Sequence, residues 1–424
     1  MAATPLEIAL IGAGNRGGRV YADSLRRHPE LARLAFIAEP DGARRKGLAA
    51  LHGLSPDRLY ASWEDLFETA PAPDAVIIAT PDRLHLGPAM RALELGYPIL
   101  LEKPIAPTRE EVLRLARAAS CSRGSVTVAH VLRYTAFFAT LKRLLDEGRI
   151  GRLMTVLHLE NVGYWHFAHS FVRGNWRKLS AASPMILAKA CHDLDLLRWL
   201  VGAPCLRVAS FGGLGYFKAE SAPVGAGERC LDCAVERGCP YSAVRFYLEE
   251  HAENHGWPVS AMTADTSPEG RLKALRSGPY GRCVYRCDND VADHQVVALE
   301  FAGAVTATLT VSAFTSENTR TLKLMGSQGE IRGHLDKGEI EVRGFLDNES
   351  DFIRVAAGPD HAGGDDGLMR AFLERLHMVK AGLEVPEALS SLAASTESHL
   401  MAFAAEEARA KGTVVKLGDL EAQS

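Results

Sequence analysis

The sequence lacks an apolar run of membrane-spanning length, and it has no excess of basic residues. Its 48 Lys and Arg residues are outnumbered by 52 Asp and Glu residues, which gives a formal net charge of −4 and argues against a nucleic-acid partner. Residues 1–5 lack the charged and apolar regions of a secretory signal peptide. We therefore expect a cytoplasmic protein that binds neither nucleic acid nor membrane.

The sequence also contains no internal repeat and no low-complexity tract. Its 424 residues, 47% apolar and 24% charged, are typical of a soluble globular protein with room for two domains. Eight cysteines in a cytoplasmic setting indicate free thiols or metal ligands rather than disulfides.

A glycine-rich turn near the N-terminus lies between two apolar runs. Residues 6–11 predict a strand buried in a parallel sheet, and residues 12–17, Gly-Ala-Gly-Asn-Arg-Gly, follow it. An amphipathic helix to about Arg27 and a second strand over residues 34–38 complete a βαβ unit that ends on Glu39.

Each part of this unit has a physical task in binding a dinucleotide. Gly12 permits the tight turn, Gly14 lets the backbone approach a pyrophosphate, and Gly17 allows close packing of helix and strand. Asn15 and Arg16 begin the helix, whose unpaired N–H groups and positive dipole end favour phosphate.

The residue at the end of the second strand bears on the choice between NAD and NADP. Glu39 can accept hydrogen bonds from both ribose hydroxyls and would repel a 2′-phosphate, which favours NAD. Arg44 and Arg45 could bind that phosphate if the loop turns back, or they could simply begin a solvated helix. NADP therefore remains an alternative cofactor.

Two more motifs end the next buried strands of the predicted sheet. The strand over residues 74–79 runs into Thr80-Pro81 and His85, and the strand over residues 97–101 runs into Glu102-Lys103-Pro104. Ligands of open α/β sheets bind beside such carboxyl ends. A last strand over residues 126–129 completes a nucleotide-binding domain, residues 1–129.

Together, the glycine turn and these two motifs resemble the Gfo/Idh/MocA family of NAD(P)-dependent oxidoreductases, closely over the first 130 residues and more loosely to the end. The resemblance implies that Thr80, Pro81, His85 and Glu102 belong to the cofactor site. It also implies that Lys103 hydrogen-bonds the nicotinamide ribose and the substrate hydroxyl, where an ammonium stabilises a developing alkoxide. The alternative for Lys103 is a surface ion pair with Glu102.

The remainder, residues 130–424, predicts an α+β domain. Successive strands over residues 294–301, 305–313 and 321–325 indicate a largely antiparallel open sheet, and helices are expected over residues 368–380 and 389–411. The overall fold class is α/β, with a Rossmann domain followed by this second domain. Family members often pair such sheets between subunits, so the resemblance implies a homo-oligomer.

A helix predicted from Ser183 or Pro184 to Leu200 groups three polar residues, Lys189, His192 and Asp193, on one face. In the resembled family this helix carries the catalytic histidine, usually with an aspartate four residues before it. Here His192 fits as general base, but the preceding position is Ala188, and Lys189 becomes a candidate second cation. A structural role for His192 is the alternative.

An aromatic and basic stretch over residues 165–177 suits a polyhydroxylated substrate, although an ordinary interdomain surface would look similar. A cysteine-containing insertion follows at about residues 217–290. The spacing of Cys230, Cys233, Cys239 and Cys283 predicts a structural zinc site, with Cys287 as an alternate ligand and unliganded thiols as the competing interpretation.

These features predict an oxidoreductase that transfers hydride between NAD and a secondary hydroxyl of a sugar, cyclitol or related glycoside. Two alternatives remain open. One is redox-neutral glycoside cleavage by elimination through transient sugar oxidation with retained NAD. The other is a non-catalytic NAD-binding sensor, against which the presence of both Lys103 and His192 argues.

Overall fold

The computed structural model describes residues 4–346, 349–356, 358 and 361–422. The first domain is a six-stranded parallel sheet in the order β3-β2-β1-β4-β5-β6. Its strands are β1 (Leu6–Ile11), β2 (Ala32–Ala38), β3 (Leu59–Tyr60), β4 (Ala75–Ile78), β5 (Ile99–Leu101) and β6 (Val126–Val128). The strand order reverses between β1 and β4, which creates the position where such sheets bind ligands.

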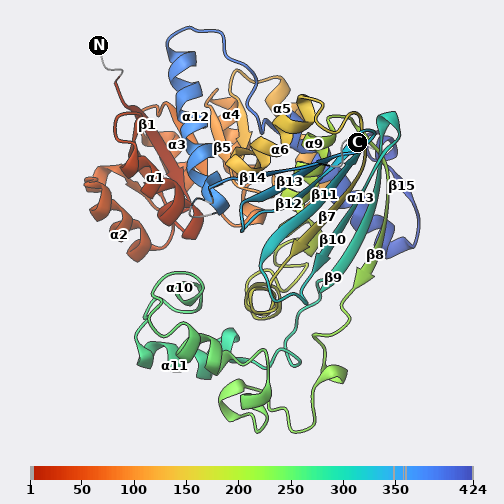
Figure 1. The fold of residues 1–424 in the computed structure, drawn as a ribbon. Coiled ribbons are helices and arrows are strands. Elements are labelled where there is room, and N and C mark those ends of the chain that lie inside the picture. The colour runs from red at the N-terminus through yellow and green to blue at the C-terminus, as the bar shows by residue number, and fades with distance from the viewer. Residues whose placement is uncertain (1–3, 347–348, 357, 359–360, 423–424) are drawn as a thin grey trace.

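Helices cover both faces of this sheet (Figure 1). They are η1 (Asn15–Tyr21), α1 (Ala22–Arg27), α2 (Gly42–His52), α3 (Trp63–Thr69), α4 (Leu86–Glu94) and α5 (Arg109–Ser120). Several begin at the residue types that cap helices best, because the side chains of Asp41, Ser62 and Thr108 each accept a backbone N–H of the first turn. The predicted Rossmann architecture is confirmed.

The second domain contains a nine-stranded sheet in the order β14-β13-β12-β11-β7-β10-β9-β8-β15. Its strands are β7 (Leu153–Asn161), β8 (Cys205–Gly213), β9 (His294–Phe301), β10 (Val305–Ser312), β11 (Thr319–Gly326), β12 (Gly329–His334), β13 (Glu339–Gly344), β14 (Ser350–Arg354) and β15 (Val415–Lys416). Among the described strands of this sheet only β10 and β7 pair in parallel, so the largely antiparallel sheet is confirmed. The sequence did not predict β8 or β15.

The helices of the second domain are α6 (Ala136–Asp146), α7 (Tyr164–Phe167), α8 (Met185–Ala188), α9 (Cys191–Val201), α12 (Gly364–Lys380), α13 (Leu392–Lys411) and α14 (Leu417–Ala422). Of these, α13 packs on both β8 of this sheet and α5 of the first domain, and α12 packs against η1 (Figure 1). On α13, buried His399 accepts the backbone N–H of Ile105 from the first domain through Nε2, at 2.9 Å. One continuous apolar core joins the domains.

The insertion between β8 and β9 extends away from the sheet (Figure 1) and carries the short helices α10 (Val259–Met262) and α11 (Pro268–Ser277). A small separate core holds it together, including Phe246, Tyr247 and Leu275. No helix in the described part of the chain is both long and apolar enough to cross a membrane.

Candidate active site

The glycine turn has the geometry that its sequence predicts. Gly12 adopts φ +91°, and a Cβ there would lie 2.6 Å from the Ala79 carbonyl oxygen. A Cβ on Gly17 would lie 1.9 Å from the Gly12 carbonyl oxygen, whereas Gly14 faces open space at the start of η1. The first and third glycines are therefore required by packing, and the second leaves its backbone accessible to a phosphate.

Glu39 lies against this turn at the end of β2. Its Oε2 accepts the N–H of Ala13 at 2.7 Å, and its Oε1 accepts the N–H of Asp41 at 2.9 Å. The Arg45 guanidinium donates to the Glu39 backbone carbonyl, while the Arg44 side chain is exposed. The loop thus brings Arg45, but not Arg44, beside the predicted ribose site.

Arg16 of the turn is held by two carboxylates. Its Nε lies 2.5 Å from Glu102, and its Nη2 lies 2.7 Å from Asp365 on α12. Tyr21 donates to the same Glu102 oxygen. Burial alone would raise the pKa of Glu102, but the charges of Arg16 and Lys103 lower it. The predicted cofactor residues Arg16 and Glu102 therefore form one ionised cluster beneath the turn; Asn15 beside them is exposed.

His85 joins the other two motifs. Its Nε2 lies 2.9 Å from the Thr80 carbonyl oxygen and its Nδ1 lies 2.7 Å from the Pro104 carbonyl oxygen. The ring is buried and each of its nitrogens faces a protein carbonyl, so His85 links the two loops; its contact with the cofactor stays a prediction. Pro81 begins the short helix η3 (Asp82–Leu84), and the Thr80 hydroxyl is buried with no partner among the described residues.

Lys103 extends from the first domain to the helix region of the second. Its Nζ donates to the Ala188 carbonyl at 2.9 Å. The predicted continuous helix from residue 183 or 184 to Leu200 is wrong here, because the chain breaks at Lys189 and Ala190 into α8 and α9. In an unbroken helix the Ala188 carbonyl would accept the His192 N–H. The break frees that carbonyl for Lys103.

His192 lies in the first turn of α9 and is only 6% exposed. Its ring centroid is 5.6 Å from that of His130 and 6.3 Å from that of His361. Its buried Nδ1 has no hydrogen-bond partner in the described part of the structure. Burial, together with the charges of Lys103 and neighbouring groups, holds the pKa of His192 well below 6.5, so the ring is neutral and able to accept a proton.

Lys189 belongs to a buried charge network. Its Nζ lies 3.1 Å from Glu160 on β7, whose other oxygen lies 2.8 Å from Arg320 on β11. Arg320 also donates to Asp193, which accepts from His158. Burial lowers the pKa of Lys189 despite Glu160. Lys189 is therefore a paired cation near His192, and its catalytic role stays a prediction.

Much of the aromatic and basic stretch contacts the insertion. Trp165 stacks on Phe246 with centroids 5.5 Å apart, and His169 bonds the hydroxyl of Tyr247 at 2.5 Å. His166 has a different partner, Asn318, 2.8 Å away. Because these side chains contact other parts of the protein, residues 165–177 are better interpreted as a surface between segments of the protein than as a substrate-binding surface.

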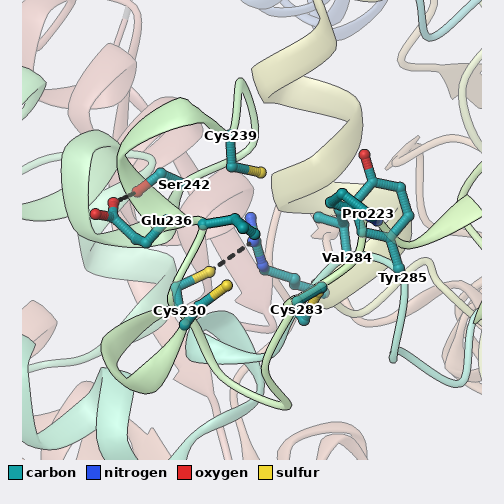
Figure 2. A pocket seen from close by; sticks show the side chains of 12 residues that line it. Pro223, Cys230, Glu236, Cys239, Ser242, Cys283, Val284 and Tyr285 are labelled. Atoms are coloured by element: carbon teal, nitrogen blue, oxygen red, sulfur yellow. Dashed lines mark hydrogen bonds between the residues drawn. The ribbon is translucent and has the colours of Figure 1, made fainter.

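The four predicted zinc ligands, Cys230, Cys233, Cys239 and Cys283, line one cavity of about 20 Å³ (Figure 2). Arg173 also lines it, with Nη2 3.4 Å from the Cys230 sulfur. However, no three Cys, His, Asp or Glu side chains in the described ranges are arranged to hold a metal ion. The four thiols lie around one cavity, as their spacing predicts. A formed zinc site is not seen among the described residues, so zinc stays a prediction.

Sequence reasoning missed several residues around His192. Glu160, Arg320 and the pair His361 and Asp365 all come from segments distant in the chain. None of these contacts left a local sequence signal. His361 precedes α12 and has a left-handed backbone, so its contact with Asp365 is not that of two residues one helical turn apart.

The fold is that of a Rossmann nucleotide-binding domain followed by a domain built on a mostly antiparallel sheet. Two family profiles match: an oxidoreductase family NAD-binding Rossmann fold over residues 6–130, and that family's C-terminal alpha/beta domain over residues 142–417. The chain belongs to the Gfo/Idh/MocA oxidoreductase family.

Similar proteins include inositol 2-dehydrogenase from Streptomyces avermitilis, 33% identical over 202 residues that cover 46% of this chain and 53% of that protein. The chain spans about half to three fifths of the length of the first curated relatives that it matches. The structure is also similar to a solved levoglucosan dehydrogenase in complex with NADH and levoglucosan, with a TM-score of 0.71 and 19% sequence identity; the match covers 98% of this chain and 100% of that chain. A solved WlbA dehydrogenase from Bordetella pertussis matches with a TM-score of 0.66 and 17% identity, over 97% of this chain and 99% of that chain. Identities this low show the fold alone.

Proposed function

We propose that this protein oxidises a secondary hydroxyl of a sugar, cyclitol or related glycoside and transfers the hydride to NAD. The contact between Lys103 and Ala188 supports this most directly, because it brings an ammonium from the nucleotide-binding domain to the segment just before His192. The matched relatives are named for inositol and levoglucosan, which are cyclic compounds with several secondary hydroxyls.

The residues have separable roles in this proposal. NAD supplies the hydride acceptor, and the accessible Gly14 backbone with Glu39 would hold its pyrophosphate and ribose. Neutral His192 takes the hydroxyl proton, and Lys103 stabilises the oxygen as negative charge develops. Lys189, whose side chain is 18% exposed, would orient substrate hydroxyls.

The test is a screen of cyclic polyols and sugars, myo-inositol and levoglucosan included, for NADH formation by absorbance, with product analysis of each mixture. Net NADH with a ketone product is expected. Ala188 in place of the family's usual aspartate favours a second candidate, elimination through transient oxidation. That reaction would give cleaved product with no net NADH.

A further inference from the structure

A buried base needs a route by which its proton leaves. His192 is 6% exposed, and its Nδ1 has no partner among the residues described. The family's usual aspartate is absent at Ala188, whose carbonyl is engaged by Lys103. A proton taken from substrate by His192 would therefore remain on a ring that burial strongly disfavours as a cation.

His361 is the neighbour that can supply the route. Its ring centroid lies 6.3 Å from that of His192, and its side chain is 44% exposed. Rings whose centroids lie this far apart leave room for one bridging water between their nitrogens, since two hydrogen bonds in series span roughly 5.6 Å. His361 is thus a titratable group that is both near the buried base and open to solvent.

A buried carboxylate orients the His361 ring. Nδ1 lies 2.8 Å from Oδ2 of Asp365, in the first turn of α12. Burial would raise the pKa of Asp365, but the hydrogen bond from His361 and the charge of Arg16 lower it well below its usual range. An ionised carboxylate only accepts, so Nδ1 carries the hydrogen and Nε2 is left to receive a proton.

The backbone at this position is also unusual. His361 adopts φ +46° and Ala362 adopts φ +54°, both in the left-handed region that favours glycine. Consecutive non-glycine residues in this region persist only where their surroundings fix them, and such strain concentrates at functional sites. The hydrogen bond to Asp365 is one such fixing contact.

We propose that His361, held by Asp365, is a proton relay between His192 and solvent during the reaction. This inference rests on the proposed function. The substrate O–H proton passes to His192, then through one water to Nε2 of His361, and from there to solvent, while the C–H hydride carries both electrons to NAD. Asp365 stabilises the imidazolium formed on His361 and remains ionised.

Other charged and titratable groups surround this path. Those facing His192 are Lys103, His130 and Arg320. Arg16 faces Asp365 and also contacts Glu102 and Tyr21. The charges of Lys103 and Arg320 around His192 favour the departure of a proton toward solvent. Because Asp365 also holds Arg16, changing Asp365 would disturb the cofactor turn, so His361 is the residue to substitute.

The deciding variant is His361→Gln, with single-turnover hydride transfer measured on whichever of myo-inositol or levoglucosan reduces NAD. We expect unchanged NAD affinity, hydride transfer slowed at least tenfold, and recovery of the rate as free imidazole is added. The matched control is His294→Gln, since His294 also has Nδ1 2.7 Å from a carboxylate, Asp293, but lies on β9. This control should behave like the wild type.

A folded His361→Gln protein that transfers hydride at the wild-type rate, while His192→Asn is slow, would overturn the relay and leave the proposed function standing. Normal rates in both variants would overturn the relay and the role of His192, whereas a failure of every tested sugar and polyol to form NADH would overturn the proposed function. An independent readout without substrate is the histidine ¹⁵N spectrum of the NAD-bound protein. The Nδ1–H tautomer of His361 is expected, and the Nε2–H tautomer would contradict the relay.

Discussion

The ammonium of Lys103 lies 2.9 Å from the Ala188 carbonyl oxygen, four residues before His192. This contact joins the end of β5 in the first domain to the break between α8 and α9 in the second. A hydrogen bond between a side chain of one domain and the backbone of the other thus positions Lys103 near His192, the two residues proposed to act on one hydroxyl. Positioning of this kind converts an encounter of separate groups into a fixed geometry.

Replacing Lys103 by Met should remove the charge that steadies the developing alkoxide but keep a side chain of similar length. Turnover should fall roughly 10²–10³-fold, the usual cost of one donor to an oxyanion. NAD should bind only modestly more weakly. Steady-state kinetics with a fluorescence titration of NAD would check both expectations, and a large loss of NAD affinity with normal turnover would contradict them.

NAD should bind more tightly than NADP, because the ionisable Glu39 carboxyl lies at the ribose end of the site. Titration of both cofactors by tryptophan fluorescence measures the difference. Arg45→Ala is the companion variant, since Arg45 contacts the Glu39 carbonyl. If NADP bound more tightly than NAD and this preference were lost in Arg45→Ala, Arg45 rather than Glu39 would determine the cofactor preference, which would contradict the prediction.

Stability should decline as the pH falls from 7 to 5.5. Burial holds the pKa of His130 well below 6.5, and both its ring nitrogens are buried without hydrogen-bond partners in the described structure, with Asp195 3.7 Å from Nε2. The unfolded chain therefore gains a proton near pH 6.5 that the folded protein does not bind, at a cost of about 1.4 kcal/mol per pH unit below that value. His130→Gln should reduce this slope in urea unfolding.

Zinc content is predicted to be about one ion per chain by elemental analysis and to fall in Cys233→Ser. Cys230, Cys233, Cys239 and Cys283 line one cavity, although no group of side chains in the described residues is arranged to hold a metal ion. Cys121→Ser is the control, since Cys121 is exposed on the first domain. A stable, metal-free wild-type protein would leave these residues as unliganded thiols.

The sequence predicted the first domain well because its signals are local. The glycine turn, the buried strands and the capping residues each specify their own conformation, and the structure places them within a few residues of expectation. The α+β domain was also predicted, since its strands alternate in the way that a one-sided antiparallel sheet requires.

The break before α9 could not be predicted, because no residue near it signals the break. The contact with the Ala188 carbonyl comes from Lys103, 85 residues before Ala188 in the chain. The network of Lys189 with Glu160 and Arg320 was missed for the same reason, since pairs from separate strands leave no spacing signal. Strand β8 was missed as well, and its partner β9 follows only after the long insertion.

The central claim is that His192 and Lys103 act on one proton transfer. The most direct test is single-turnover hydride transfer in His192→Asn, Lys103→Met and the double variant, with folding and NAD binding confirmed for each. Each single change should slow the step about 10²–10⁴-fold, and the double variant should lose less than the product of the two. Near wild-type hydride transfer in His192→Asn would contradict the account.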